Sequence, residues 1–170
     1  MKLIVLRGNS GSGKSTVARE LRRMLGDGVA LVEQDYLART VLGQQKTDAG
    51  GNQELIALVA RHALHASDAV VVEGMLSSAR YAAMLRDLAS EPGVTAWFYY
   101  FDVPFDETVT RHATRDKAGS FGADELRQWF VEDDLLPFVR ERLIPAQSSA
   151  ADTAATIVAE AGLRPGTLPG

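Results

Sequence analysis

Residues 8–15 read Gly-Asn-Ser-Gly-Ser-Gly-Lys-Ser and match the phosphate-binding pattern G-x-x-x-x-G-K-[ST] at every specified position. The glycines let the backbone approach phosphate groups closely and turn amide N–H groups inward as a nest for an anion. The Lys14 ammonium can reach the β- and γ-phosphates during transfer, and the Ser15 hydroxyl can ligate Mg²⁺. This P-loop predicts binding of MgATP. The residues expected to contact the nucleotide are Gly8, Asn9, Ser10, Gly11, Ser12, Gly13, Lys14, Ser15 and Thr16.

Two acidic residues follow apolar runs that predict buried strands. Asp35 comes after Val29–Val32, and Glu73 ends Ala69–Val72. Ligands of open parallel sheets bind outside the carboxyl ends of the strands, and we expect both strands to lie beside the one that feeds the P-loop. We assign Asp35 to orienting the acceptor hydroxyl and accepting its proton, and Glu73 to the Mg²⁺ site. The alternatives are a helix N-cap for Asp35 and a solvated acid for Glu73.

Arg111 and Arg115 are four residues apart and therefore share one helical face. Guanidinium groups that close over the donor phosphates would stabilise the charge of a phosphoryl-transfer transition state. Gly119 and Gly122 would let a lid of about residues 111–125 open and close. The alternative for Arg111 is a surface ion pair with Glu107 at the (i, i+4) spacing.

Several segments together resemble the small P-loop kinases: residues 8–15, Asp35-Tyr36…Arg39, and Phe101-Asp102-Val103-Pro104 followed by Arg111 and Arg115. The nearest likeness is the kinase domain of phage polynucleotide kinase, with its zeta-toxin and chloramphenicol phosphotransferase relatives. The resemblance implies an adenylate-kinase-like fold, with Asp35 as the catalytic base, Arg39 on the acceptor side and Arg115 on the donor phosphates. Val70–Gly74 looks more like uridine-kinase relatives, which disfavours a polynucleotide acceptor.

The acceptor pocket is expected to be built by residues 36–52 and 75–82. Within the second segment, Arg80 would bind an anionic acceptor or would be an ordinary surface arginine. The aromatic run 97–101 is expected to pack in the core rather than stack on bases. No spacing among the histidines suggests a metal site or a triad; His62 is expected on a helix face, and His65 and His112 on the surface.

Apolar runs alternate with helical patterns, which predicts an α/β fold with a five-stranded parallel sheet flanked by helices in one domain spanning 1–170. The expected strands are Leu3–Leu6, Val29–Val32, Ala69–Val72, Val94–Phe101 and a weak one near Leu143–Ile144. Four expected helices have defined bounds: Lys14–Leu25, Tyr36–Leu42, Phe105–Thr114 and Thr153–Glu160. Two more lie between the second and fourth strands: the first has Leu55, Leu58, Val59 and His62 on one side, and the second runs through Tyr81, Leu85 and Leu88. A further helix carries Leu126, Trp129, Phe130 and Leu135 and extends up to Pro137. The tail, about 162–170, is expected to fray.

Composition narrows the function classes. The 170 residues carry a net charge of −4 and no cysteine, which argues against a nucleic-acid coat protein, a disulfide framework and a thiolate metal site. Apolar runs are too short for a signal peptide or a membrane span, so a cytoplasmic protein is expected. The guanine-reading Asn-Lys-x-Asp sequence does not occur, which disfavours a GTPase.

These patterns predict an ATP-dependent kinase that phosphorylates a hydroxyl of a small molecule: a nucleoside, a sugar or an antibiotic-like metabolite. The alternatives are a polynucleotide 5′-hydroxyl kinase and a nucleotide-binding switch that controls a partner without appreciable transfer. The sequence does not predict an oligomeric state.

Overall fold

The structure is a computed structural model that describes residues 1–44, 52–113 and 122–164. Its centre is a sheet of five strands in the order β2-β3-β1-β4-β5, and every neighbouring pair is parallel. The strands are β1 Lys2–Arg7, β2 Val29–Glu33, β3 Ala69–Glu73, β4 Thr95–Asp102 and β5 Arg142–Pro145. The predicted α/β class and parallel five-stranded sheet are therefore confirmed.

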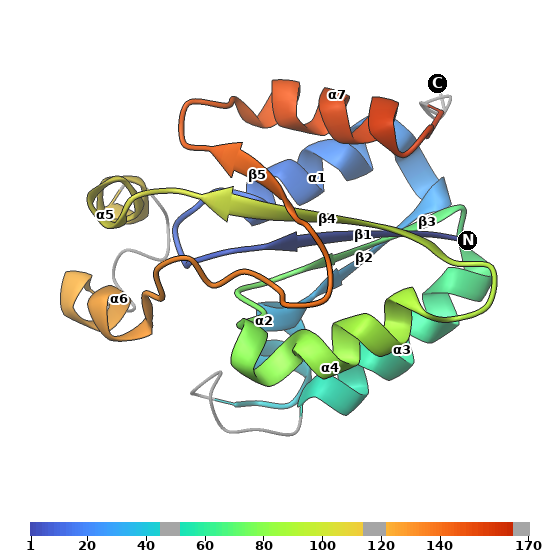
Figure 1. The fold of residues 1–170 in the computed structure, drawn as a ribbon, viewed down its shortest axis with the longest axis horizontal. Coiled ribbons are helices and arrows are strands. Elements are labelled where there is room, and N and C mark those ends of the chain that lie inside the picture. The colour runs from blue at the N-terminus through green and yellow to red at the C-terminus, as the bar shows by residue number, and fades with distance from the viewer. Residues whose placement is uncertain (45–51, 114–121, 165–170) are drawn as a thin grey trace.

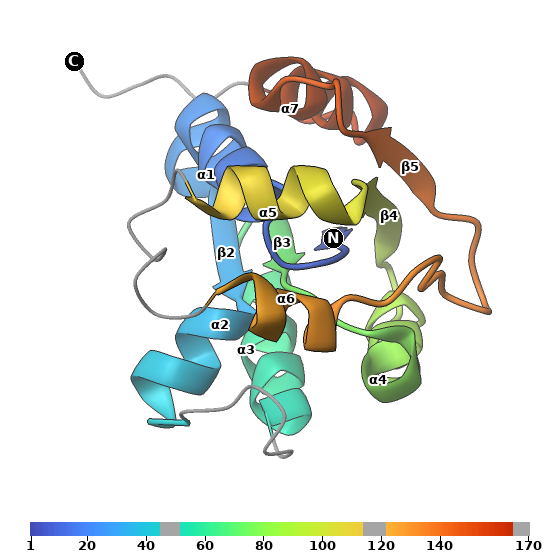
Figure 2. The same ribbon diagram turned by 90° about the vertical axis from the view of Figure 1, so that its left-hand side faces the viewer.

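Helices cover both faces of the sheet, and two more lie across the carboxyl ends of the strands (Figures 1 and 2). One face carries α1 Lys14–Leu25 and α7 Ala150–Glu160, and the other carries α3 Asn52–Ala66 and α4 Ser78–Ala89. At the carboxyl edge lie α5 Phe105–Ala113 and α6 Ala123–Trp129. The remaining helical pieces are η1 Gly26–Gly28, α2 Gln34–Tyr36 and the π-helical η2 Leu37–Val41. None of the helices within the described residues is long and apolar enough to cross a membrane.

The core consists of two apolar layers, one on each face of the sheet. Along β1, Ile4 and Leu6 pack with the layer under α1 and α7, whereas Leu3 and Val5 pack with the layer under α3 and α4. Successive side chains of a strand point to opposite faces, so a strand covered on both faces must be apolar throughout. The unbroken apolar run before the P-loop is thereby explained.

The face that helix α3 turns to the sheet matches the predicted side only in part. Its buried residues are Asn52, Ile56, Ala57, Ala60, Ala63 and Leu64. Leu58, expected on the packed side, is 65% exposed, and His62 is exposed as well. Alanines on the inner face give a weak hydrophobic signal, although they let a helix approach a sheet closely. Leu55 and Val59 are partly buried against the core, so the predicted side was right for these two residues and wrong for Leu58 and His62.

Helix α6 ends at Trp129, although the sequence predicted helix up to Pro137. Phe130 is already extended, with ψ 124°. The Asn9 side chain accepts a hydrogen bond from the Val131 N–H at 3.0 Å and donates one to the Val131 carbonyl at 2.8 Å. This tertiary contact takes both backbone groups that a continuing helix would use. His112, expected on the surface, is buried in α5.

Candidate active site

The P-loop leaves the carboxyl end of β1 and enters α1, and close packing around it requires glycine. Gly8 and Gly11 have φ of 134° and 84°. A Cβ atom would lie 2.8 Å from the Phe101 carbonyl oxygen at Gly8 and 2.7 Å from the Thr108 carbonyl oxygen at Gly11. Both distances are too short for any side chain. The loop is therefore wedged against the end of β4 and against α5.

Lys14 is buried at the first position of α1, with its ammonium turned into the loop. Nζ donates to the Asn9 carbonyl at 2.7 Å and to the Ser12 hydroxyl at 3.2 Å. The backbone N–H of Thr16 bonds to the Gly13 carbonyl at 3.0 Å and so joins the loop to the first helical turn. The residues predicted to contact the nucleotide form one continuous cradle at a helix N-terminus, which is a site that binds phosphate.

Ser15 and Glu73 meet next to this cradle. The Ser15 hydroxyl donates to Glu73 Oε1 at 3.0 Å, and Glu73 is only 3% exposed, so the solvated alternative is wrong. Burial raises the pKa of the Glu73 carboxyl; Lys14 and the Ser15 hydrogen bond act against this, while Glu33 and Asp35 add to it. Hydroxyl and carboxylate oxygens are ligands that Mg²⁺ accepts, so the pair fits the predicted metal role. The described residues hold no cluster of three or more metal-binding side chains of the His, Cys, Asp and Glu type. A magnesium ion here would therefore draw its other ligands from the nucleotide and water.

Asp35 lies in α2 and pairs with Arg39, one turn further along the chain. Arg39 Nε donates to Asp35 Oδ1 at 2.5 Å, and the Asp35 side chain is 41% exposed. Helix α2 begins at Gln34 without a side-chain cap, so the capping alternative for Asp35 is wrong. The strand before Asp35 is separated from β1 by β3, which corrects the expected neighbourhood. Asp35 still lies close enough to Glu73 to raise its pKa.

Arg111 joins three parts of the structure. Its Nη1 donates to the Ser12 carbonyl in the P-loop at 3.1 Å, and its Nη2 to the Ala146 carbonyl after β5 at 2.5 Å. Its Nε donates to Glu107 at 2.8 Å, as the ion-pair alternative proposed. Arg111 therefore holds the P-loop against α5 and the chain after β5. Arg115 and Gly119 lie outside the described residues.

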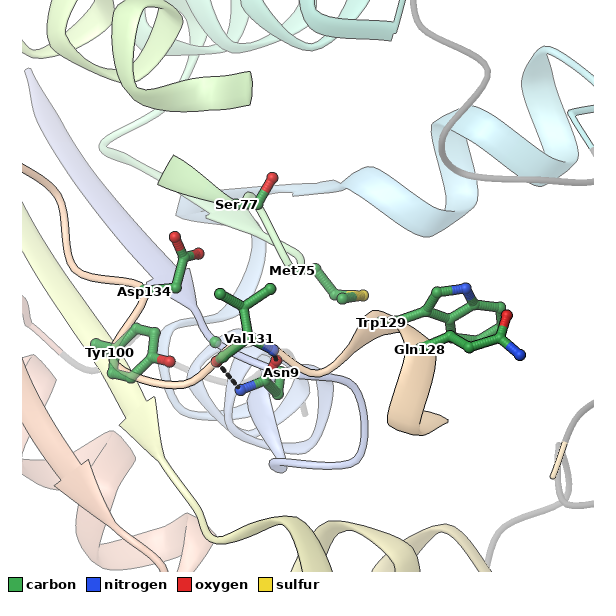
Figure 3. Close-up of a pocket in the computed structure, with 9 residues that line it drawn as sticks. Asn9, Met75, Ser77, Tyr100, Gln128, Trp129, Val131 and Asp134 are labelled. Carbon is green, nitrogen blue, oxygen red and sulfur yellow. Dashed lines mark hydrogen bonds between the residues drawn. The ribbon is translucent and has the colours of Figure 1, made fainter. Parts of the chain in front are cut away.

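A pocket of about 180 Å³ opens beside the start of the P-loop (Figure 3). The residues that line it come from four stretches of the chain: Gly8, Asn9, Met75, Ser77, Tyr100, Gln128, Trp129, Val131 and Asp134. Of the two segments expected to form an acceptor pocket, 75–82 contributes Met75 and Ser77, and no lining residue comes from the described part of 36–52. Arg80 is not among the lining residues; its guanidinium lies 5.9 Å from the centre of the Tyr81 ring.

The walls of this pocket are fixed by Arg7, which the sequence analysis did not identify. Arg7 is completely buried. Its Nη2 donates to Asp134 at 2.7 Å, its Nη1 to Glu141 at 2.6 Å and its Nε to the Leu76 carbonyl at 3.2 Å. Asp134 also accepts from the backbone N–H and the hydroxyl of Ser78. The signal available in the sequence was an arginine at the end of an apolar strand, directly before the P-loop.

The loop after β3, residues 74–77, is held from its other side by Gln34. Leu76 is buried with φ 44°, a conformation that costs about 1–3 kcal/mol for a non-glycine residue. Gln34 Oε1 accepts from the Leu76 N–H at 3.2 Å, and Gln34 Nε2 donates to the Tyr81 hydroxyl at 2.8 Å. The Tyr81 hydroxyl in turn donates to Asn52 at 2.7 Å. These bonds hold the loop in the geometry that places Met75 and Ser77 at the pocket.

Comparison with known proteins identifies the family. Residues 3–129 match the model of the AAA domain family AAA_33. No curated protein shows a significant sequence match. Among solved structures, the APS kinase of Mycobacterium tuberculosis, in complex with AMPPNP and APS, superposes with a TM-score of 0.69 at 19% identity over 93% of this chain and 95% of that one. A gluconokinase from Sinorhizobium meliloti 1021 gives 0.64 at 21% over 95% and 91%.

The tunicamycin resistance protein of Deinococcus radiodurans gives a TM-score of 0.64 at 15% identity over 99% of this chain and 100% of that one. At these identities the likeness establishes the fold alone. The specific likeness to phage polynucleotide kinase is not among these matches. The family match and the shared architecture agree with the P-loop geometry, and the chain belongs to the AAA domain family AAA_33, with the fold of small P-loop kinases.

Proposed function

We propose that this protein is an ATP-dependent phosphotransferase that moves the γ-phosphoryl group of ATP to a hydroxyl of a small molecule. The observation that carries the proposal is a P-loop whose lysine bonds to a residue that lines a small pocket. Lys14 Nζ donates to the Asn9 carbonyl at 2.7 Å, and Asn9 lines the pocket. Since the P-loop lysine meets the β- and γ-phosphates, the pocket adjoins the γ-phosphate end of the nucleotide site.

The proposed reaction is an in-line transfer. An acceptor hydroxyl oxygen forms a bond to the γ-phosphorus, and the bond from that phosphorus to the β,γ-bridging oxygen breaks, leaving its electron pair on ADP. We assign the hydroxyl proton to the Asp35 carboxylate, which Arg39 orients and which does not itself line the pocket. Ser15, with Glu73 behind it, would hold Mg²⁺, which neutralises phosphate charge when bound.

The proposed roles of the other residues, the co-substrate, the metal and the location complete the proposal. Arg115 is retained as the arginine of the donor phosphates, within a lid of residues 111–125 in a single kinase domain. Arg39 and Arg80 are retained as residues of the acceptor side. ATP and Mg²⁺ are the proposed co-substrate and metal, and the cytoplasm is the proposed location. Kinases that share the fold carry the names of small acceptors, such as APS and gluconate, which supports this acceptor size.

The size of the pocket favours a compact acceptor over a polynucleotide. Its volume of about 180 Å³ is below the roughly 300–1,000 Å³ usual for ligand pockets. The decisive experiment measures ADP release from MgATP with a panel of hydroxylated small molecules and a 5′-hydroxyl oligonucleotide. We expect small-molecule acceptors to raise ADP release above the level of the Lys14→Ala variant. Stimulation by the oligonucleotide alone would favour the polynucleotide kinase, and ATP binding without stimulation by any acceptor would favour the regulatory switch.

A further inference from the structure

The residues that line the pocket indicate which class of acceptor it would bind. This inference rests on the proposed function. One side of the pocket is apolar and polarisable. Trp129 lies at the end of α6, and the Met75 side chain extends toward it (Figure 3). Arg127 stacks on Phe105, 3.7 Å from the ring centre, and Phe130 packs edge-on against the same ring, so both neighbours of the Gln128–Trp129 pair are fixed to α5. Indole and thioether surfaces favour the C–H-bearing or flat face of a ring.

The other side of the pocket offers hydrogen-bonding groups. Ser77 contributes a hydroxyl and Asp134 a carboxylate, and Asn9 contributes an amide whose nitrogen and oxygen also bond to the Val131 backbone. Asp134 is held in place by Arg7 at 2.7 Å and by the backbone N–H of Ser78 at 3.0 Å. A fixed carboxylate accepts hydrogen bonds from hydroxyl groups, whereas it repels an anion.

Behind this wall, two acidic side chains face one guanidinium group. The single guanidinium of Arg7 faces two carboxylates, Asp134 and Glu141, and its third direct partner is the Leu76 carbonyl. Each of its three nitrogens donates to the protein, so Arg7 is engaged in building the wall. A ligand anion placed next to Asp134 would lie beside an acidic side chain whose guanidinium partner already bonds to protein groups.

We infer that the acceptor is a neutral, hydroxyl-bearing ring compound, of the class to which sugars and nucleosides belong. Its apolar face packs on Trp129 and Met75, and its hydroxyls bond to the polar wall near Asn9, Ser77 and Asp134. The reactive hydroxyl points toward the start of the P-loop. Acceptors that carry a carboxylate or a phosphate are selected against by Asp134.

The first test compares acceptors in matched pairs that differ in charge: glucose with gluconate, ribose with ribose 5-phosphate, and a nucleoside with its 5′-monophosphate. ADP release is measured with saturating MgATP. We expect kcat/KM for at least one neutral member to exceed that of its anionic partner by about tenfold or more, which corresponds to about 1.4 kcal/mol. Equal or better use of the anionic members overturns the inference and leaves the proposed kinase activity intact. If no member of any pair raises ADP release above the Lys14→Ala level, the proposed function itself fails.

The second test asks whether the pocket binds the acceptor. Trp129→Ala should raise KM for the neutral acceptor about tenfold while KM for ATP and kcat change little, and Trp129→Phe, which keeps an aromatic face, should recover most of the loss. Leu135→Ala is the matched control, because Leu135 is 46% exposed in the same segment and does not line the pocket. ADP affinity and melting temperature show that each variant is folded. An unchanged acceptor KM in Trp129→Ala, or a change confined to ATP, overturns the assignment.

Discussion

Glu73, at the end of β3, and Asp35, in α2 just after β2, have different surroundings, and this difference separates their proposed roles. Glu73 is buried against the P-loop serine, where its pKa is raised, while Asp35 is half-exposed and ion-paired with Arg39. A buried acid next to Ser15 suits the metal site, whereas a solvent-accessible carboxylate can approach a substrate hydroxyl. Both acids could be found from the sequence because polar residues that end buried strands are conspicuous. Their environments depend on the strand order.

The Asp35→Asn substitution tests the proposed role of Asp35 as the catalytic base. Asparagine keeps the size of the side chain but cannot accept the hydroxyl proton, so turnover should fall by roughly a hundred- to ten-thousand-fold. ADP affinity and melting temperature should stay near wild type, because Asp35 belongs to an exposed ion pair worth about 0–1 kcal/mol. Arg39→Gln breaks the same ion pair but keeps the base, so it measures separately how much the proposed orienting role of Arg39 contributes to turnover. Wild-type turnover in Asp35→Asn would move the base assignment to Glu73.

The Lys14→Ala substitution tests whether the P-loop binds ATP and supports phosphoryl transfer. Removal of the ammonium deletes the charge that meets the β- and γ-phosphates, and transfer should fall on the order of a hundredfold or more. ATP affinity should weaken sharply as well. Isothermal titration with ATP and an ADP-release assay check both effects. A folded variant with unchanged ATP affinity and turnover would refute the P-loop assignment.

At the scale of elements, Arg111 links α5 to the P-loop and to the chain after β5 through two hydrogen bonds, and a third bond pairs it with Glu107 within α5. Arg111→Met should raise KM for ATP about tenfold and lower the free energy of unfolding by about 1–3 kcal/mol, since two carbonyls lose their donor. Glu107→Gln is the matched control, because it removes only the exposed ion pair and should change stability by less than about 1 kcal/mol. Urea unfolding and ATP kinetics measure the two effects. Equal effects of both substitutions would mean that Arg111 acts only through its ion pair.

The elements also show what local sequence can and cannot predict. Helix α1 has the bounds predicted from its apolar spacing, because Val17, Ala18, Leu21 and Leu25 form one clear face. The end of α6 was missed because it depends on Asn9, more than a hundred residues away in the chain. Trp129 and Asp134 were consequently not recognised as pocket residues. Long-range hydrogen bonds such as this one leave no periodic trace in the sequence.

At the scale of the whole molecule, the sheet, its parallel direction and its P-loop could be predicted, since each follows from apolar runs and one specific motif. The pocket could not, because four separated segments meet there only through strand order and the buried Arg7. The sequence alone does not show whether an arginine at a strand end is buried in a hydrogen-bond network or lies on the surface. The nucleotide site can therefore be predicted from the sequence, whereas the proposed acceptor pocket can be recognised only when the fold is known.

The Arg7 network makes stability depend on pH in a defined direction. Burial raises the pKa of Glu141 above its ordinary value of 4.5; the hydrogen bond from the Leu136 N–H and the Arg7 guanidinium act against this. In the window between 4.5 and the raised value, the folded protein binds more protons than the unfolded chain, so the free energy of unfolding falls as pH rises. Glu141→Gln removes this titration. Its stability relative to wild type should therefore increase from pH 4 to pH 8, roughly, as measured by urea unfolding. A relative stability that decreases over this range would show that pairing with Arg7 outweighs burial.

Arg7 is covalently next to Gly8, yet its carboxylate partners lie in the segment 131–141. Attempts to exchange acceptor preference between family members by transplanting that segment would thus have to carry Asp134 and Glu141 along with it. A graft that omitted both would strand a guanidinium in the interior, where removing the partner of a buried ion pair costs about 3–5 kcal/mol. A chimaera in this fold must therefore combine Arg7, the last residue of β1, with a segment that keeps its two carboxylate partners.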